Sequence, residues 1–497
     1  MLTRRFFIGG AASAAALGAR GIFAAAPGTA ASGPANLKFG VVSDVHIGYR
    51  KGGKAFHEQY TTDTFKATLG RFRDAGADAV VIAGDMSNFG IGPELVALGE
   101  AWFEIFPGSR APDGRRVEPI FVTGNHDNGT GRAKFVFDDE NDLKANIISN
   151  DSAKWWDLAF HEEWKPIYKK EVKGYSFVGA HWVIGDCRGI DERFNDGIPG
   201  WYAENGRTLD PSKPFFHVQH PHPKGTVHGG KVWGQDNGES VKALSAYPNA
   251  IAFSGHSHNS LTDDRAIWQG AFTSVGCATL RNVKTAPEWL KQPKAGFENY
   301  RTPKALMETC DPIKAMKPIT RFDCRHEQFL SVYDDRIVFS RREAISGEKL
   351  GDDLVMPLPA AERRPFDHKL REAKAMAPEF PAAAALKVSR GQGRLRGGKG
   401  AKNVKADVWR IVIPQANALR NTPAASYDIE AIGENGEREE FAVINEGFRF
   451  SPDSARARRD SLAIIACSRI KSERFTLKVR AVSCWGLRSA PLEFKVV

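Results

Sequence analysis

Polar side chains that can bind metal ions or carry protons follow five short apolar segments of this 497-residue chain. Each segment has the length of a buried strand. The side chains that follow them are Asp44, His46, Asp85, Asn125, His126, His220, His256 and His258. Their nitrogen and oxygen donors include no thiolate, a set that suits Fe, Mn, Zn or Co better than Ca or an iron–sulfur cluster. The pattern predicts a metal site assembled from several loops.

The elements that must position these side chains are strands that alternate with helices. Helical spacing over 56–75 and 93–106 separates the first strands, and this alternation predicts an α/β layer architecture. Ligands of open α/β sheets bind beyond the carboxyl ends of the strands, so we expect the polar residues to meet at one rim. The predicted strands are 37–44, 78–85, 118–125, 176–187, 215–220 and 250–256.

Two further segments complete this half of the chain. Residues 127–175 are rich in tryptophan, and we expect them to carry helices and to line a cleft. Residues 328–345 alternate as a β-hairpin does.

The order of the polar motifs resembles the calcineurin-like metallophosphoesterase superfamily. That family carries D-x-H, GD, GNH[DE], H and GHxH, and all five occur here in that order, 35–95 residues apart, within residues 37–258. The resemblance implies a four-layer αββα sandwich. It also implies an enzyme that hydrolyses phosphate esters with two metal ions, whose identity stays open among Fe, Mn, Zn and Co.

The resemblance assigns a role to each motif residue. One group would hold the first ion: Asp44, His46 and His258. A second group would hold the other ion: Asn125, His220 and His256. Asp85 would bridge both ions, and a metal-bridging hydroxide would attack phosphorus in line. His126 binds no metal in this family and would act as general acid toward the leaving group, or neutralise the transition state.

The histidine of the second group has two competitors. His220 lies in the run FFHVQHPHP, whereas family members often carry an HHxP-like run. His217 is expected on the opposite strand face, and His222 already follows a proline. We therefore favour His220.

Three further residues are candidates for binding substrate. Arg188 follows Gly-Asp-Cys at a predicted strand end, where it could meet a phosphate or form a structural ion pair. His228 and Trp233 lie in the glycine-rich loop TVHGGKVWG. The remaining histidines have no ligand-like neighbours, and we expect them to be packed or at the surface: His57, His161, His181, His326 and His368.

The motif around the predicted bridging aspartate narrows the substrate. Ser/Thr protein phosphatases of this superfamily carry GDxxDRG, but residues 84–90 read GDMSNFG and lack that Asp and Arg. The tyrosine that purple acid phosphatases place after this region is not evident either. We expect a phosphodiesterase, with a phosphomonoesterase or nucleotidase that scavenges phosphate as the alternative. A non-catalytic envelope-binding protein is the third interpretation.

The N-terminus has the features of an export signal. In residues 1–26 a basic start precedes an Ala/Gly-rich apolar run that ends in an A-x-A-like site. The run Thr-Arg-Arg-Phe-Phe at 3–7 resembles a twin-arginine signal, and an ordinary secretory signal is the alternative. We expect the twin-arginine machinery as a partner, a linker at 27–36, and a periplasmic or secreted protein.

The C-terminal part differs in composition, and we place a boundary near residue 380 between a catalytic domain (37–380) and a basic domain (381–497). Residues 381–497 hold 21 Lys and Arg against 12 Asp and Glu. Short alternating strands without helical spacing predict an all-β sandwich here, and its end resembles fibronectin type III or immunoglobulin-like modules.

A basic run lies at the start of this domain. Residues 387–405 contain seven Lys and Arg and no acid, and we expect a solvated loop that could touch an envelope polyanion. The run has no aromatic side chain for base stacking, so no specific nucleic-acid partner is expected.

The six cysteines are too few for a disulfide scaffold. Cys310 with Cys324, and Cys467 with Cys484, are spaced so that each pair could close a short loop. Bridges and buried free thiols remain equal alternatives.

Overall fold

The structure is a computed structural model that describes residues 33–50, 54–55, 58–128, 136–137, 139–183, 194–230, 232–285, 324–395, 404–416 and 423–497. Several expectations fall outside these residues: the export signal, His57, Arg188, Cys310 and positions 396–403 of the basic run.

Two six-stranded sheets form the first half of the molecule. The first sheet has the order β14-β13-β12-β1-β4-β5, and the second has the order β10-β11-β9-β8-β7-β6. Strands β1, β4 and β5 run parallel, as do β7, β8, β9 and β11. The first sheet contains β1 (Leu37–Val42), β4 (Ala79–Ala83), β5 (Glu118–Val122), β12 (His326–Val332), β13 (Arg336–Glu343) and β14 (Leu354–Pro357). The second contains β6 (Ile167–Val172), β7 (Tyr175–Ala180), β8 (Phe215–Val218), β9 (Ala250–Ser254), β10 (Ile267–Gln269) and β11 (Thr273–Gly276).

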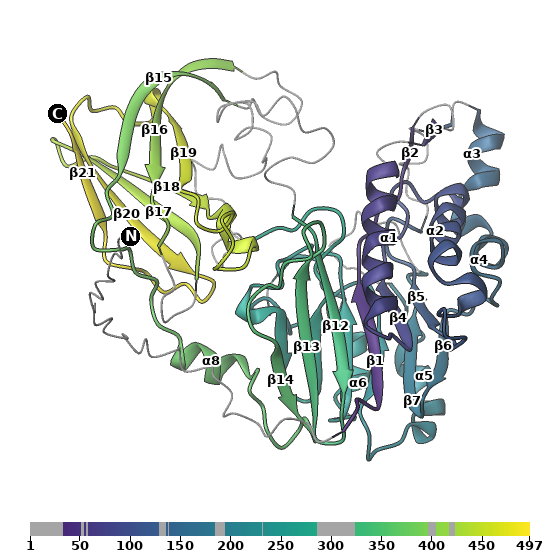
Figure 1. The fold of residues 1–497 in the computed structure, drawn as a ribbon. Helices are drawn as coiled ribbons and strands as arrows, with labels where there is room; N and C mark the ends of the chain where they lie inside the picture. Colours follow the sequence, from purple (N-terminus) through teal and green to yellow (C-terminus); the bar gives the residue numbers. More distant parts are fainter. Residues whose placement is uncertain are drawn as a thin grey trace, which may run out of the picture.

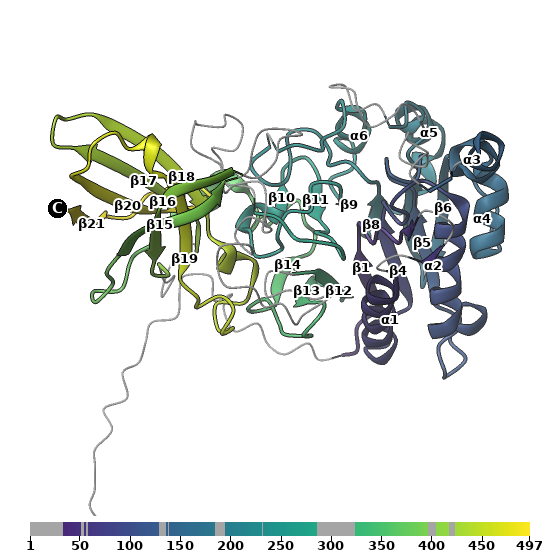
Figure 2. The same cartoon turned by 90° about the horizontal axis from the view of Figure 1, so that it is seen from above.

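Helices cover the outer faces of both sheets (Figures 1 and 2). The longer helices are α1 (Glu58–Asp74), α2 (Gly92–Ile105), α3 (Glu140–Asn146), α4 (Ser152–Phe160), α5 (Ile198–Asn205), α6 (Glu239–Leu244) and α8 (His368–Lys374). The short elements here are β2 (Tyr49–Arg50), β3 (Lys54–Ala55), η1 (Pro107–Ser109), η3 (Ile148–Asn150), η4 (Gly206–Thr208) and η5 (Asp264–Ala266).

The alternation of side chains along the strands explains the layers. In β1, Phe39 points between the sheets and packs edge-on against Phe177 of the second sheet, with ring centroids 5.3 Å apart. Val42, at the end of the same strand, points outward and packs in a second core with Leu69 of α1. A third core packs α5 and α6 onto the outer face of the second sheet. Both faces of each parallel region are therefore covered by apolar contacts, and the four-layer αββα prediction is confirmed.

The tryptophan-rich segment carries helices, as expected. They are α3 and α4, and Trp155 and Trp156 are buried in the core that α4 shares with α2. The ring of Trp156 packs edge-on against Phe160 at 4.7 Å. These side chains form the apolar stripe by which α4 packs. That the segment lines a cleft stays a prediction.

The C-terminal part contains two antiparallel sheets around a separate apolar core. Their strand orders are β15-β16-β19 and β18-β17-β20-β21. The strands are β15 (Lys387–Leu395), β16 (Val404–Ile413), β17 (Ala424–Gly433), β18 (Arg438–Ile444), β19 (Ser461–Ala466), β20 (Phe475–Ser483) and β21 (Leu492–Val496), with η7 (Glu446–Arg449) and η8 (Cys467–Arg469) between them. The all-β prediction for this part is confirmed.

Two details of this part correct the sequence interpretation. Residues 387–395 form the edge strand β15 rather than a loop, because backbone pairing with β16 gives them a place in a sheet. The side chains of Lys387, Ser389, Arg390 and Gln392 are exposed, which suits an edge strand. Cys467 and Cys484 are free thiols, so the bridge between them is absent.

The two parts are joined by hydrogen bonds around η7. The Arg449 guanidinium donates to the carbonyl of Val283 at 2.9 Å, and the Arg449 carbonyl accepts from His326 Nε2 at 2.8 Å. Thr262 Oγ1 donates to the Phe448 carbonyl. Among the described residues, no helix combines the length and apolarity that crossing a membrane requires.

Candidate metal centre

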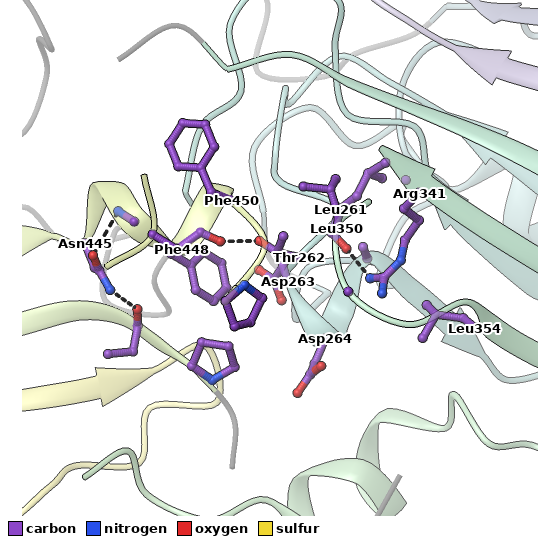
Figure 3. A pocket seen from close by; sticks show the side chains of 18 of the residues that line it. Leu261, Thr262, Asp263, Asp264, Arg341, Leu350, Leu354, Asn445, Phe448 and Phe450 are labelled. Atoms are coloured by element: carbon purple, nitrogen blue, oxygen red, sulfur yellow. Dashed lines mark hydrogen bonds between the residues drawn. The ribbon is translucent and has the colours of Figure 1, made fainter. Parts of the chain in front are cut away.

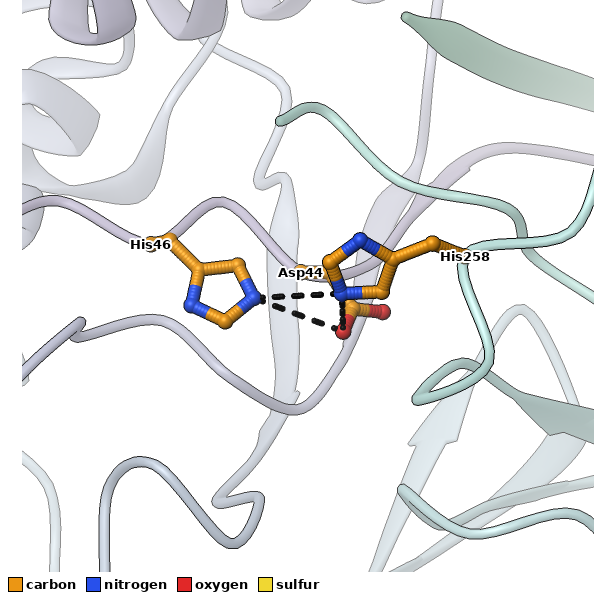
Figure 4. Close-up of side chains that lie close together, drawn as sticks. All are labelled: Asp44, His46 and His258. Atoms are coloured by element: carbon orange, nitrogen blue, oxygen red, sulfur yellow. Dashed lines mark hydrogen bonds and ion pairs between the residues drawn. The ribbon is translucent and has the colours of Figure 1, made fainter. Parts of the chain in front are cut away.

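The loops after β1 and β9 bring the first predicted ligand group together. His258 Nε2 lies 2.8 Å from Asp44 Oδ1 and 3.3 Å from His46 Nε2, and His46 Nε2 lies 3.6 Å from Asp44 Oδ1 (Figure 4). All three reactive atoms point to one spot. Ligand atoms that share an ion at bonds of about 2.1 Å are themselves about 3.0–3.5 Å apart, so these separations fit a single metal site.

The loops after β4, β8 and β9 bring together a second group, which consists of Asp85, His220 and His256. Asp85 Oδ2 lies 3.2 Å from His220 Nε2 and 3.6 Å from His46 Nε2 of the first group. The other oxygen, Asp85 Oδ1, accepts a hydrogen bond from the His126 backbone N–H at 2.8 Å. One carboxylate oxygen therefore faces both groups, which is the position of a bridging ligand.

Asn125 lies in the loop that follows β5. Its side chain is 4% exposed, and its Oδ1 accepts no hydrogen bond from the described residues. A buried amide oxygen without a donor costs free energy, which an ion at this point would remove. With the two convergent groups, this atom is the evidence that the residues present fit a pair of metal ions.

The backbone at the ligand positions is unusual. The residues with φ in the left-handed region include Asp44 (53°), His46 (53°), Asp85 (52°), His256 (68°) and His258 (60°). Asp and His tolerate this region better than most side chains, but each such residue still costs of order 1–3 kcal/mol. Strain concentrated at five ligands indicates a site whose side-chain directions are fixed by the surrounding fold.

Two glycines of the motifs are required by close approach. Gly84 has φ of 86°, and a Cβ there would lie 2.3 Å from His220 Nδ1. A Cβ on Gly255 would lie 1.8 Å from Ser43 Oγ and 2.5 Å from Asp44 Oδ2. The missing side chains allow the ligand loops of the two sheets to touch.

His220 is distinguished from its competitors by which ring nitrogens are already bonded. Its Nδ1 donates to the Ala83 carbonyl at 2.7 Å, which leaves Nε2 facing Asp85, the usual arrangement of a metal-binding histidine. Both nitrogens of His217 are taken, by Tyr202 and Gln219. Both nitrogens of His222 are taken as well, by the hydroxyls of Ser254 and Ser257.

His126 lies beside the two groups, and one of its ring nitrogens forms a third convergent group with His46 and Asp85. Its Nδ1 bonds to the Asn88 carbonyl at 2.8 Å, which requires a proton on Nδ1, and its Nε2 lies 4.0 Å from Asp85 Oδ2. The ring stands edge-on to His46, with centroids 4.4 Å apart. Its Nε2 is therefore the atom that faces a substrate bound at the two groups.

Asp127 links two of the ligand loops. Its carboxylate accepts hydrogen bonds from the backbone N–H groups of Ser87 at 2.6 Å, Gly124 at 2.7 Å and Met86 at 3.2 Å. Burial and the nearby charge of Asp85 raise the pKa of Asp127 to about 6. The residue thus holds the loop of Asp85 against the loop of Asn125 and His126.

The charges of the site balance one another. Burial would raise the pKa of Asp85, but the neighbouring His220 and His126 lower it well below the usual range of a carboxyl. Burial would lower the pKa of His220, but Asp85 and Asp44 raise it to about 10. Burial lowers the pKa of His46. The carboxylates are thus ionised and available as ligands.

The predicted substrate residues are placed very differently. Trp233 is 61% exposed and stacks on the ring of His256, with centroids 4.3 Å apart. His228 is buried, with Nδ1 3.6 Å from Asp263 Oδ2 and its ring against His222. Its backbone N–H donates to the Arg265 carbonyl at 2.7 Å. A place for His228 in a substrate pocket stays a prediction.

Sequence reasoning missed two cations near the site. Arg281 donates to the Asn88 side chain, on the side of His126. The backbone N–H of Lys284 donates to the His258 carbonyl at 2.7 Å, and its ammonium lies 6.0 Å from the Trp233 ring centroid. The signal that could have found them is their place shortly after β11, whose carboxyl end lies beside that of β9.

A match to a known protein family identifies the domain that contains these ligand groups. Residues 37–260 match the family of calcineurin-like phosphoesterases. They form a calcineurin-like phosphoesterase domain. The chain is a metal-dependent phosphoester hydrolase, because this domain carries the convergent Asp and His groups described above.

Solved structures of similar shape include phosphatases. A dimetal phosphatase from Danio rerio shares 12% identity over 65% of this chain and 99% of that chain, with a TM-score of 0.35. A purple acid phosphatase from yellow lupin (Lupinus luteus) seeds shares 12% identity over 64% of this chain and 53% of that chain, with a TM-score of 0.38. Similarities this low say nothing about substrate. No curated protein sequence matches the chain significantly.

A separate cavity of about 280 Å³ lies where the phosphoesterase domain meets the C-terminal sheets (Figure 3). Its walls combine Thr262 and Arg341 of the domain with Asn445 and Phe448 of the C-terminal part. None of the residues that line it belongs to the three ligand groups.

Proposed function

We propose that this protein is an exported phosphoesterase that hydrolyses small phosphate esters, with phosphodiesters preferred over monoesters. The observation that carries the proposal is Asp85 Oδ2, which faces His46 and His220 of two separate ligand groups while His126 stands 4.0 Å away. Such a pair of sites beside a proton donor is what phosphoester hydrolysis requires.

The site residues have three roles: to hold the first ion, to hold the second ion, and to donate a proton. The first ion would be held by Asp44, His46 and His258. The second would be held by Asn125, His220 and His256, with Asp85 shared. Two ions so held polarise phosphoryl oxygens and lower the pKa of bound water.

His126 supplies the proton. With Nδ1 fixed on the Asn88 carbonyl, a protonated His126 presents Nε2–H toward the ligand groups. It can give this proton to the departing alkoxide, or offset negative charge on the phosphoryl group. General-acid assistance of this kind is typically about 10²–10⁴-fold.

The substrate preference and the cellular place rest on sequence. The chain lacks the GDxxDRG arginine of Ser/Thr protein phosphatases, which favours small esters over phosphoproteins. The twin-arginine-like run at 3–7 favours export in the folded state, and hence a periplasmic or secreted enzyme. A phosphate-scavenging monoesterase or nucleotidase is the alternative.

The test is a comparison of wild-type protein with Asp85→Asn after loading with Mn, Zn, Fe or Co. The wild type should hydrolyse bis-4-nitrophenyl phosphate faster than 4-nitrophenyl phosphate. Asp85→Asn should lose metal and activity together, because one shared ligand serves both groups. A variant that binds two metals by elemental analysis would contradict the bridging role. Faster monoester hydrolysis would favour the scavenging alternative, and wild-type protein that binds no metal would favour the envelope-binding interpretation.

A further inference from the structure

The mouth of the metal centre carries an exposed aromatic surface. Trp233 is 61% exposed although it is among the largest apolar side chains, and its ring lies against His256, one of the predicted ligands. Exposed apolar rings at a site edge are typical of surfaces that bind a second ring. The backbone after Trp233 also approaches this histidine closely, since a Cβ on Gly234 would lie only 2.7 Å from the His256 ring.

A cation lies beside this ring. Lys284 has an exposed side chain, and its ammonium is 6.0 Å from the Trp233 centroid. Its backbone is fixed, because its N–H donates to the His258 carbonyl and Ser260 N–H donates to its own carbonyl at 3.0 Å.

Together these residues define one edge of the substrate site. The scissile phosphate must lie at the two ligand groups, next to Asp85. A planar group attached to that phosphate can then stack on Trp233, and a second negative group can reach Lys284. Neither residue is needed to hold a metal, so their arrangement bears on which ester is chosen.

We propose that Trp233 and Lys284 select phosphate esters that carry a planar ring and a second anionic group, as nucleotides do. This inference rests on the proposed function, since it describes the substrate of that same site. It assigns no role in bond cleavage to either residue. They bind the part of the substrate that does not react.

The experiment uses three diesters with the same 4-nitrophenyl leaving group. The first carries a methyl group, the second thymidine linked through its 5′ oxygen, and the third thymidine with an added 3′-phosphate. Since the leaving group is constant, differences in kcat/KM report the rest of the ester. For wild-type protein we expect kcat/KM to rise from the first to the second by at least about fivefold, the lower end of stacking one base on an aromatic side chain. A further rise of about three- to fivefold from the second to the third corresponds to one exposed ion pair.

Two variants separate the contributions. Trp233→Leu should reduce the preference for thymidine over methyl, and Trp233→Phe should restore part of it because a ring is present again. Lys284→Met should reduce the preference for the 3′-phosphate and leave the thymidine preference. Lys369→Met, an exposed lysine on α8, is the matched control that should change neither preference.

Several results would overturn the proposal. Equal losses for all three esters in Trp233→Leu would mean that Trp233 only supports His256. Equal rates of the wild type on all three would exclude selection. If the wild type hydrolyses none, the proposed function fails, and calorimetry with thymidine 3′,5′-bisphosphate then decides the present proposal. Binding that Trp233→Leu weakens would sustain it, and absence of binding would end it.

Discussion

The role of His126 is indicated by its distance from the shared carboxylate more than by its hydrogen bond. Metal-binding histidines also use one nitrogen for a carbonyl, as His220 does with Ala83, so the bond to Asn88 alone does not exclude a ligand. The difference lies in distance, since His126 Nε2 is 4.0 Å from Asp85 Oδ2 whereas His220 Nε2 is 3.2 Å away. His126 is therefore the more distant of the two from the shared carboxylate, which agrees with a proton donor beside the ligands.

Replacement of His126 tests that role. His126→Ala should lower kcat about 10²-fold or more with metal content intact, because a proton donor is lost but no ligand. The loss should shrink for esters of 4-nitrophenol, whose anion leaves without a proton. Stopped-flow or steady-state rates on alkyl and nitrophenyl esters measure this, with the exposed His161→Ala as control. A loss of the same size for every leaving group would show that His126 positions substrate instead.

At the scale of elements, the site depends on hydrogen bonds between loops that follow different strands. Asp127 receives three backbone N–H groups from the loops after β4 and β5. Backbone bonds between Asp44 N–H and the Gly84 carbonyl, and between His46 N–H and the Asp85 carbonyl, join the loops after β1 and β4 in the same way, each at 2.9 Å. These ties hold the left-handed ligand residues in place.

Removing one acceptor should therefore weaken metal binding from outside the ligand shell. In Asp127→Asn the amide NH₂ would face N–H donors, so we expect metal affinity to fall by about 10- to 100-fold, as for other outer-shell partners. Competition with a chromogenic chelator measures it. Asp139→Asn is a matched control, because Asp139 also accepts two backbone N–H groups but caps the distant α3. Unchanged affinity in Asp127→Asn would mean that the loops are held by other contacts.

The element scale also separates what the sequence could reveal from what it could not. Ligands such as Asp44 and His258 could be found because each directly follows its own strand. The choice of His220 over His217 was reached from strand alternation, but the bonds that exclude His217 come from Tyr202 and Gln219. The strand β15 was missed because its glycines and polar residues have little strand propensity of their own. Pairing with β16 supplies the missing stabilisation.

At the scale of the whole molecule, His326 lies at the junction of the two parts. Its Nδ1 accepts from the Leu261 N–H at 3.1 Å, and its Nε2–H donates to the Arg449 carbonyl at 2.8 Å. The first bond requires an unprotonated Nδ1, and therefore a neutral ring. Burial lowers the pKa of His326 to about 3, whereas an unfolded histidine titrates near 6.5.

This difference predicts acid sensitivity of the junction. Above about pH 6.5, His326 is neutral in both the folded and the unfolded protein. As the pH falls toward about 3, His326 of the unfolded chain binds a proton and His326 of the folded chain does not. The free energy of unfolding therefore decreases over this range. The loss is at most about 1.4 kcal/mol per pH unit for one histidine. Calorimetry measures the fall in Tm between pH 7 and pH 5. This fall should be smaller in His326→Gln than in the wild type. In the control His161→Gln, which changes an exposed histidine, the fall should equal that of the wild type. An identical fall in His326→Gln would place the acid sensitivity at other buried histidines.

Contacts between the two parts of the molecule were harder to predict from the sequence than the elements within each part. The α/β layers followed from strand and helix alternation, and their αββα order from the family resemblance. The all-β character of the C-terminal part followed from its regular short strands. The junction could not be foreseen, because His326 and Arg449 are 123 residues apart and neither belongs to a recognisable motif. The same holds for the cavity beside it, whose walls come from both parts.

The ligand groups also have a mechanical consequence. Asp44, Asp85 and Asn125 follow strands of the first sheet, whereas His220, His256 and His258 follow strands of the second. Each ion would thus be a cross-link that clamps one sheet to the other at their shared edge. Metal affinity and the cohesion of the two layers are then thermodynamically linked, and we expect removal of the ions by a chelator to lower the free energy of unfolding.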